Sequence, residues 1–191
     1  MRPIDDGEER ALVARARKGD LNAFETLVKL HQRGIYALCF RMAGIHQAAD
    51  DLAQETFVKA YFALSGFKEG LSFVAWLRTI AVNTSLNYLR LRKKEVSLDA
   101  LGPDGPKAAP VPARGRSDEP ADEVARREAG RKFREAVDAL PPEQKSVFVL
   151  RFFEDRDYVT IARALDISPG TVMSRLSRAR QKIRSQMAGY L

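Results

Sequence analysis

Along most of this chain, apolar residues recur three or four positions apart, which is the spacing of one face of an α-helix. In the first half, the pattern predicts four helices, at about residues 9–18, 20–44, 47–64 and 72–94. Gly19 and Gly44 stand where the first two helices should end, and Asp20 is suited to cap the second. The alternation of apolar and polar residues that is typical of a β-strand is not convincing anywhere in the sequence, so this half is expected to be entirely helical.

The helical pattern breaks off in the middle of the chain. Residues 102–120 contain five prolines and three glycines and almost no large apolar residue, which predicts a flexible or partly extended linker. Helical spacing then resumes in three segments, at about 123–139, 143–153 and 158–184. The predicted fold is all-α, with two small helical domains, 1–96 and 124–191, joined by a Pro/Gly-rich linker, 97–123.

The last segment divides into a short helix, a tight turn and a second helix. Asp166 and Ile167 turn the chain, and Ile167 is apolar, as a residue tucked between two helices should be. Ser168 is a good N-cap and Pro169 suits the first position of the second helix. The buried stripe of that helix is expected to consist of Val172, Leu176, Ala179 and Ile183. The segment is therefore predicted to be a helix-turn-helix unit that closes the second domain.

The second helix of this unit carries five cations and no acid between Thr171 and Arg184. An apolar stripe on one side and unneutralised cations on the other suit a helix to the major groove of DNA. The residues expected to approach base edges are Met173, Ser174, Ser177 and Arg178. The residues better placed for phosphates are Arg175, Arg180, Lys182 and Arg184. The alternative is a surface helix pair that packs only on its own domain.

The helix predicted at 72–94 carries a different nucleic-acid signal. Aromatic rings such as Trp76 and Tyr88 offer stacking surfaces to unpaired bases, and Asn83 and Asn87 offer hydrogen-bonding groups. The helix ends in a basic run, residues 89–94, that suits a nucleic-acid backbone. These features are typical of a surface that binds single strands. The alternative, which periodicity leaves open, is that the aromatic residues simply form the core.

An acidic patch precedes this helix. Asp50, Asp51, Gln54 and Glu55 lie close together on the helix predicted at 47–64. Because DNA would repel such a patch, it more plausibly docks a basic protein partner. Acids in the first turn of a helix also stabilise it through the helix dipole, and the two interpretations are compatible.

The charge of the chain is distributed unevenly. The formal net charge is +7 over 191 residues. Residues 1–95 hold 15 Lys and Arg against 11 Asp and Glu, residues 96–125 hold 3 against 6, and residues 126–191 hold 14 against 8. Two basic blocks around an acidic linker suggest a polyanion partner at each end.

Several functional classes are disfavoured. Cys39 is the only cysteine, so an intramolecular disulfide is impossible, and with only two histidines the usual structural zinc site is not expected. No apolar run approaches the ~20 residues of a membrane span, and the N-terminus does not resemble a signal peptide. A phosphate loop and a nucleophile motif are also missing, so no enzyme activity, metal or cofactor is expected. A reducing cytosol fits these features.

Four motifs resemble those of one protein family. Residues 50–61, DDLAQETFVKAY, resemble the conserved-region-two helix of bacterial sigma factors that binds core polymerase. Residues 73–92, FVAWLRTIAVNTSLNYLRLR, resemble the promoter −10 helix of the extracytoplasmic-function group, also called group IV. Residues 140–145, LPPEQK, and 167–180, ISPGTVMSRLSRAR, resemble its region four. The match covers nearly the whole chain outside the linker.

The resemblance implies a role for each motif. Region two would bind core RNA polymerase through Asp51, Gln54, Glu55, Phe57 and Tyr61. It would capture and help melt the −10 promoter element through Phe67, Lys68, Ser72, Trp76, Asn83, Asn87, Tyr88 and Arg90. Region four would bind the −35 element through Thr171, Met173, Ser174, Arg175, Ser177, Arg178 and Arg180. The implied partners are core RNA polymerase, promoter DNA and an anti-sigma factor, in the cytoplasm, with no cofactor and no small-molecule substrate.

The sequence departs from the family pattern at four places, one of which is the unusually polar run at residues 154–157. Residues 68–72 read KEGLS where the family often has Arg-Gly-Asp/Glu-Ser-Ser, which leaves the base preference of this loop open. Asp166 stands where the family usually has glycine, and Asp tolerates the left-handed conformation at some cost. Met173 replaces a frequent Lys or Arg, so we expect the −35 sequence that is recognised to differ.

The predicted linker is long enough for a promoter. Residues 97–123 can span at most roughly 90 Å when extended. The centres of the −35 and −10 elements lie about 23 base pairs apart, or on the order of 78 Å at ~3.4 Å per pair. The linker can bridge this distance with little slack. The competing hypothesis is a stand-alone helix-turn-helix regulator, which would bind palindromic duplex DNA as a dimer.

Overall fold

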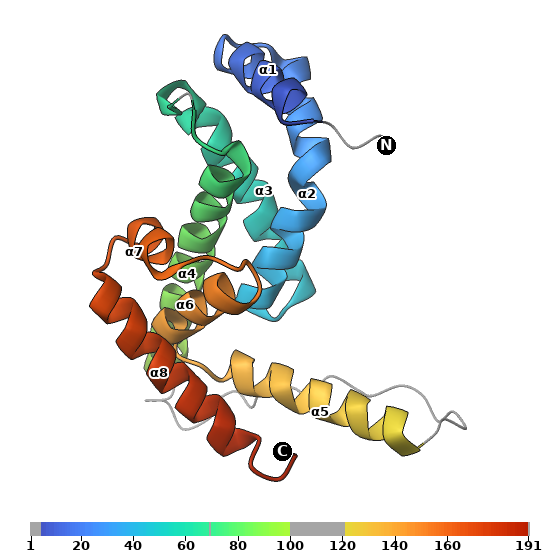
Figure 1. The fold of residues 1–191 in the computed structure, drawn as a ribbon, viewed down its shortest axis with the longest axis vertical. Helices are drawn as coiled ribbons and strands as arrows, with labels where there is room; N and C mark the ends of the chain where they lie inside the picture. The colour runs from blue at the N-terminus through green and yellow to red at the C-terminus, as the bar shows by residue number, and fades with distance from the viewer. Residues whose placement is uncertain (1–4, 69, 100–120, 191) are drawn as a thin grey trace.

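The computed structural model describes residues 5–68, 70–99 and 121–190. These residues form α-helices and one short 3-10 helix, and no strand occurs within the described ranges (Figure 1). The N-terminal unit consists of α1 (Asp6–Arg17), α2 (Leu21–Ala43), α3 (His46–Ala63), η1 (Leu64–Gly66) and α4 (Phe73–Asp99). The C-terminal unit consists of α5 (Ala121–Asp138), α6 (Pro142–Phe152), α7 (Tyr158–Leu165) and α8 (Pro169–Gln186). The predicted all-α fold is confirmed.

The ends of the first two helices follow from local residues. The Asp5 side chain accepts a hydrogen bond from the Glu8 amide at 2.8 Å and caps α1. Asp20 caps α2 in the same way, by accepting from the Ala23 amide at 3.0 Å. Gly44 ends α2 in the left-handed conformation, with φ of 74°. A Cβ added at Gly44 would lie 3.1 Å from an oxygen of the Asp138 carboxylate, so the position is crowded as well as left-handed.

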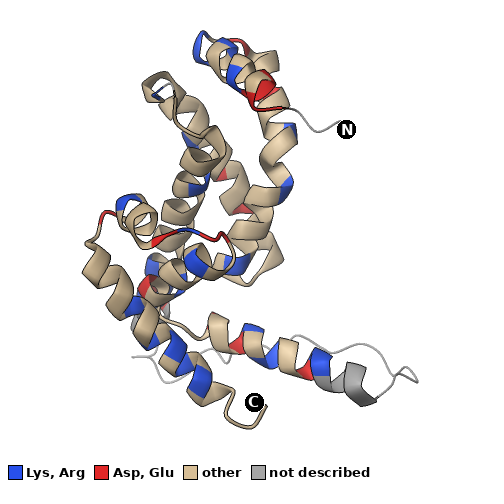
Figure 2. Ribbon diagram, viewed as in Figure 1, with Lys and Arg blue, Asp and Glu red and all other residues tan. Residues whose placement is uncertain are grey.

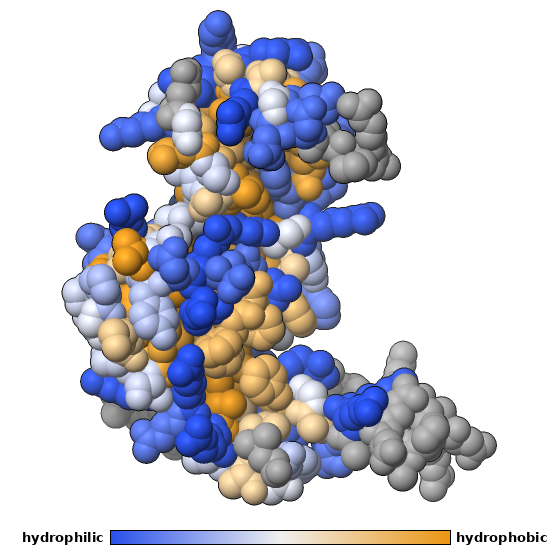
Figure 3. All heavy atoms as spheres, in the orientation of Figure 1, coloured by the Kyte–Doolittle hydropathy of each residue, from blue (hydrophilic) through white to orange (hydrophobic). Residues whose placement is uncertain are grey.

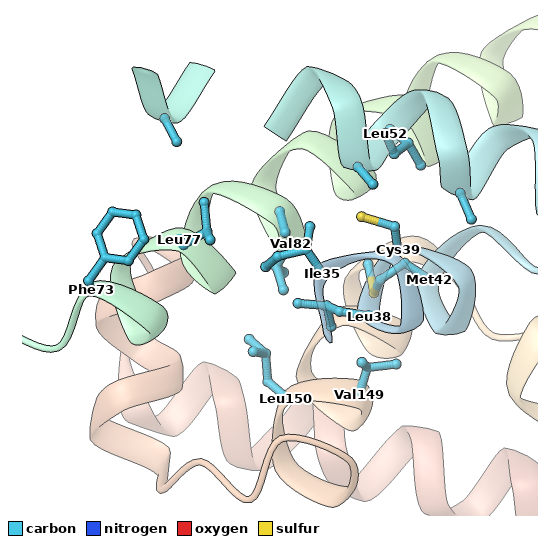
Figure 4. Packing of buried hydrophobic residues seen from close by; sticks show 14 of the residues in the cluster. Ile35, Leu38, Cys39, Met42, Leu52, Phe73, Leu77, Val82, Val149 and Leu150 are labelled. Carbon is cyan, nitrogen blue, oxygen red and sulfur yellow. The ribbon is translucent and has the colours of Figure 1, made fainter. Parts of the chain in front are cut away.

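In the N-terminal unit, α2, α3 and α4 pack on one another, and α1 packs on α2 (Figure 1). The faces that these helices turn inward carry the apolar residues of the predicted periodic pattern, and Leu27, Leu38, Met42 and Leu77 are fully buried. Cys39 is also buried and is a free thiol, as expected, and burial raises the pKa of its side chain. Figure 4 shows Leu38, Met42 and Leu77 among the side chains that point toward one another from the neighbouring helices.

The C-terminal unit ends in the predicted helix-turn-helix, α7 and α8. Asp166 ends α7 in the left-handed conformation, with φ of 51° and ψ of 53°. The Ser168 hydroxyl accepts from the Thr171 amide at 3.1 Å and caps α8, whose first residue is Pro169. The buried residues of α8 are those of the expected stripe, Val172, Leu176, Ala179 and Ile183. The local interpretation of this segment is therefore confirmed.

The two units pack directly against each other. Helix α6 contacts both α2 and α4, and α7 contacts α4. One cluster of buried apolar residues continues from the N-terminal unit into α6, α7 and α8. Helix α4 runs past Lys94, and α5 begins at Ala121, so both helices enter the segment predicted as linker. The rest of that predicted linker, 100–120, lies outside the described residues.

Candidate functional site

The acidic patch lies on an exposed face of α3. Asp51, Gln54 and Glu55 are all exposed, and their spacing places them on one side of the helix. Asp51 accepts a hydrogen bond from Gln47 at 3.3 Å, and Glu55 pairs with Lys59 at 2.6 Å. These partners come from the same helix, so the acidic groups remain available to another molecule.

Two apolar residues extend the same face and were missed by the sequence analysis. Val58 is 55% exposed and Phe62 is 77% exposed. They follow Glu55 and Asp51 at helical spacing, so the face is acidic at one end and apolar at the other. Continuing the i, i+3, i+4, i+7 pattern outward from Asp51 would have found them. A large ring left this exposed on a rigid helix is a typical anchor of a protein interface.

Phe57 and Tyr61 lie on the flank of α3 and not on this face. Phe57 is half-buried against the core. The Tyr61 ring makes an edge-to-face contact with Phe24 of α2, at 5.1 Å between centroids, and another with Phe62 at 5.7 Å. Tyr61 therefore supports the position of the exposed Phe62 ring.

The loop that leads into α4 carries an internal aromatic cluster. Phe67 is only 5% exposed, and its ring lies 5.1 Å from that of Trp76 and 5.9 Å from that of Phe73. Trp76 is half-buried, whereas Lys68 and Ser72 are exposed. Phe67 therefore holds the loop in place, and the exposed polar residues are those that a base could meet.

A cleft lies between this loop and α1. It has a volume of about 620 Å³ and is lined on the α1 side by residues that include Arg10, Val13 and Arg17. On the loop side its lining includes Leu71 and Ser72. The cleft thus has apolar walls and charged groups of both signs, since Asp6 and Glu9 line it beside the two arginines, and it lies next to the loop expected to bind an unpaired base.

The outward face of α4 brings together Asn83, Asn87 and Arg90, which are all exposed. Tyr88 is half-buried and packs against the core. Asn83 Nδ2 donates to the carbonyl oxygen of Ala164 in α7 at 3.1 Å, and Arg90 Nε pairs with Glu143 of α6 at 3.1 Å. Burial alone would raise the pKa of Glu143, but its own backbone amide and Arg90 hold that pKa below the usual value. Two residues of the predicted −10 surface are therefore occupied by the C-terminal unit.

The outward face of α8 is open. Met173 is 57% exposed, and Ser174, Ser177 and Arg178 are exposed beside it. Thr171 and Arg175 are half-buried. Figure 2 shows Lys and Arg following one another along α8. Lys182, by contrast, donates to the carbonyl oxygen of Ala139 at 2.9 Å, which ties α8 to the end of α5.

Aromatic residues at the end of α6 form an exposed apolar region. Phe152 and Phe153 are 48% and 41% exposed. The Arg180 guanidinium lies 5.2 Å from the Phe152 ring centroid, and that of Arg41 lies 5.2 Å from the Phe153 centroid. Figure 3 shows hydrophobic residues gathered over the middle of this face, where α6 lies in Figure 1.

Within the described ranges, His, Cys, Asp and Glu do not gather into a group that could hold a metal ion. None of the helices in the described part of the chain combines the length and apolar character needed to cross a membrane.

Comparison with protein-family models matches both units. Residues 27–95 match the family described as Sigma-70 region 2, and residues 130–183 match Sigma-70, region 4. The first match covers α3 and most of α2 and α4, and the second covers the end of α5, all of α6 and α7, and most of α8.

Curated relatives match along nearly the whole chain. The chain is 32% identical to the ECF RNA polymerase sigma factor SigW of Bacillus subtilis over 178 residues, covering 92% of this chain and 94% of the relative. It is 34% identical to the RNA polymerase sigma-H factor of Pseudomonas aeruginosa, covering 92% of each chain. It is 33% identical to the ECF RNA polymerase sigma-E factor of Haemophilus influenzae, covering 94% and 95%.

Solved structures show the same fold. The sigma factor RpoE of Bartonella quintana, in complex with the anti-sigma factor NepR, superposes with a TM-score of 0.62 at 25% identity, covering 86% of this chain and 96% of that one. CnrH, in complex with the cytosolic domain of CnrY, superposes with a TM-score of 0.64 at 25% identity, covering 95% and 98%.

Proposed function

The chain belongs to the extracytoplasmic-function family of RNA polymerase sigma factors, and we propose that it divides polymerase binding and promoter recognition among three helical surfaces. As an alternative sigma factor, it directs promoter-specific transcription initiation. In the proposal, α3 binds core polymerase, α4 with its preceding loop captures the −10 element, and α8 reads the −35 element. The observation that carries the proposal is the exposed acidic and apolar face of α3, which lies on a different helix from either DNA surface.

The α3 face is suited to a protein partner. Asp51 and Glu55 attract basic groups and repel DNA, and Phe62 supplies an apolar anchor of the kind that dominates binding energy at interfaces. Phe57 and Tyr61 would act mainly by holding the helix and its exposed ring in place. We place core polymerase on this face.

The proposed −10 surface uses exposed polar residues around a buried aromatic support. Lys68, Ser72, Asn83, Asn87 and Arg90 can offer hydrogen bonds or charge to an extruded strand. Trp76 and Tyr88 are half-buried and can offer ring edges, while Phe67 fixes the loop from within. Binding of unpaired bases would offset the few kcal/mol that unstacking requires.

In the proposed −35 surface, α8 enters the major groove. Met173, Ser174, Ser177 and Arg178 would approach base edges, and Thr171, Arg175 and Arg180 would lie nearer to phosphates. Such a factor performs no chemistry itself and relies on the polymerase for catalysis. We place its action in the cytoplasm, where the polymerase works.

An anti-sigma factor is the further partner in this proposal. Two solved relatives are recorded in complexes, RpoE with the anti-sigma factor NepR and CnrH with the cytosolic domain of CnrY. The similar fold of this chain over most of its length supports a partner of the same kind.

Binding to core polymerase tests the proposal. We expect the double variant Asp51→Lys, Glu55→Lys to lose core binding, measured by co-elution and by fluorescence anisotropy of a labelled chain. The matched control is Glu25→Lys, because Glu25 is exposed on α2 and pairs with Lys29 at 2.7 Å, much as Glu55 pairs with Lys59. Equal binding by both variants would remove α3 from the proposal.

A gel shift distinguishes this function from that of a stand-alone regulator. A sigma factor should shift its promoter strongly only when core polymerase is added. A regulator would bind palindromic duplex alone at near-physiological salt.

A further inference from the structure

The Arg180 side chain lies on the same face of α8 as the residues proposed to read the −35 element. Positions 173, 177, 180 and 184 follow helical spacing, and the residues there, Met173, Ser177, Arg180 and Arg184, are all exposed. The same four residues line one hollow of about 540 Å³, whose lining also includes Tyr158 of α7. Arg180 is therefore placed beside the base-reading positions of the helix.

The neighbour of Arg180 is an aromatic ring and not an acid. Its guanidinium carbon lies 5.2 Å from the centroid of the Phe152 ring, at the end of α6. Among the residues that the structure describes, no Asp or Glu forms an ion pair with Arg180. Arg41, Arg78 and Arg90, by contrast, each pair with a glutamate. Arg180 thus keeps its full charge for another molecule.

A ring and a carboxylate hold an arginine in different ways. A carboxylate neutralises the guanidinium and accepts hydrogen bonds from its N–H groups, whereas a ring attracts the charge through its π face and leaves those donors unused. A phosphate needs both the charge and the donors, because it binds arginine through paired N–H···O bonds. An aromatic neighbour can therefore fix the position of Arg180 without competing with DNA.

The Phe152 ring is itself held by other rings. It lies 4.6 Å from the ring of Phe148, which is only 5% exposed, and the Phe148 ring lies 6.3 Å from that of Phe133 in α5. Phe148 belongs to the buried apolar cluster of the C-terminal unit, and Phe133 packs against that cluster. Phe152 is half exposed, so its ring rests on this cluster while it supports Arg180 at the surface.

We propose that Phe152 is a positioning residue for −35 recognition, whose ring holds the Arg180 guanidinium in place for a phosphate of the promoter backbone. The inference rests on the proposed assignment of α8 to the −35 element. An unsupported arginine side chain loses rotamer freedom when it binds, and one that a ring already holds loses less. The ring therefore raises the affinity for duplex DNA without adding a charge or a base contact.

The test is a double-mutant cycle on the holoenzyme, in which binding to a labelled promoter duplex is measured by anisotropy over a salt series. Phe152→Leu keeps an apolar side chain but removes the π face, and should weaken binding about two- to fivefold. Arg180→Gln should weaken binding and reduce the slope of log affinity against log salt by about 1. Phe152→Leu should leave that slope unchanged, because the charge that meets the phosphate is still present. In the double variant, the change at Phe152 should have no further effect.

Phe153 provides the matched control. It is the next residue, it is 41% exposed, and an arginine lies at the same distance of 5.2 Å from its ring centroid. That arginine is Arg41 of α2, so Phe153→Leu should leave duplex binding unchanged. Phe152→Tyr retains the ring and should bind like the unaltered chain. Urea melts show whether each variant is folded, and Phe152→Met takes the place of Phe152→Leu if the latter is unstable.

Two results would overturn the positioning role. One is that Phe152→Leu binds the duplex no more weakly than Phe153→Leu does. The other is that Phe152→Leu causes the same loss whether residue 180 is arginine or glutamine, since the ring would then act through a group other than Arg180. A failure of the proposed function would look different, because Arg180→Gln would itself leave both the affinity and the salt slope unchanged.

Discussion

The ammonium of Lys145 is buried at 3% exposure, and its only charged partner within 4 Å in the described structure is Asp138, at 2.7 Å. Burial lowers the pKa of Lys145 below its usual value, and Asp138 offsets part of that effect. Asp138 is itself half exposed. Lys145 therefore needs Asp138 more than Asp138 needs Lys145, because only the lysine has lost most of its hydration.

This inequality predicts opposite outcomes for two substitutions. Asp138→Asn leaves a buried cation without its counter-charge and should lower the free energy of unfolding by about 1–3 kcal/mol. Lys145→Met removes the buried charge and leaves a carboxylate that water can reach, so it should change stability by less than about 1 kcal/mol. Urea denaturation followed by circular dichroism measures both. A larger loss for Lys145→Met than for Asp138→Asn would contradict the argument.

Phe62 is expected to contribute to polymerase binding without contributing to folding. Because its side chain is 77% exposed, Phe62→Ala should shift the urea midpoint only slightly. It should weaken binding to core polymerase by on the order of tenfold, as loss of an exposed aromatic anchor does. Leu21→Ala is the control, since Leu21 is 63% exposed on α2. If both variants bind core equally well, the apolar end of the α3 face has no role in binding.

Two arginines of α8 should respond differently to substitution. Arg178→Ala should cost about 1–3 kcal/mol on the preferred −35 sequence and relax base preference at one position. Arg184→Ala should weaken binding evenly across sequences and reduce the slope of log affinity against log salt by about 1. Anisotropy titrations of the holoenzyme on promoter variants over a salt series measure both effects. Identical profiles would mean that Arg178 contacts only the backbone.

Replacing the left-handed residue Asp166 with glycine should stabilise the protein. A residue with a side chain at φ of 51° costs about 1 kcal/mol relative to glycine, and an acid at the C-terminal end of a helix is unfavourable. Asp166→Gly should therefore raise the free energy of unfolding by roughly 0.5–1 kcal/mol, and Asp166→Val should lower it. Thermal and urea melts should show that the glycine variant is more stable than the unaltered chain and that the valine variant is less stable. If the glycine variant were less stable than the unaltered chain, the Asp166 side chain would have to make a compensating interaction.

Local signals in the sequence predicted the helices well. The Asp20 and Ser168 caps, Gly44 and the apolar stripe of α8 act within a few residues, so spacing and residue type were sufficient to place them. The turn at Asp166 was predicted from its residues, and its left-handed conformation followed from the family resemblance, because the family usually has glycine there. Helix α4 passes Lys94 because the residues that follow it include no proline or glycine before Gly102.

Long-range packing was not predictable in this way. The hydrogen bond between Arg41 and Glu154 joins residues 113 positions apart, and no periodic pattern encodes such a pair. The burial of Phe67 likewise depends on rings from α4, which an aromatic residue in a loop does not reveal. Exposure of Phe62 could have been predicted, because extending the helical pattern from Asp51 reaches it. The roles of the three surfaces remain predictions that the experiments above test.

Gly44 must remain a glycine for two separate reasons, one in its own backbone and one in the C-terminal unit. Its backbone must turn left-handed to end α2, and its missing side chain leaves room for the Asp138 carboxylate of the other unit. Any replacement would strain the turn, and its Cβ would crowd the Asp138 side chain, whose carboxylate would have to shift slightly. Residue 44 is thus a point where the turn that ends one helix and the approach of the other unit depend on the same missing side chain.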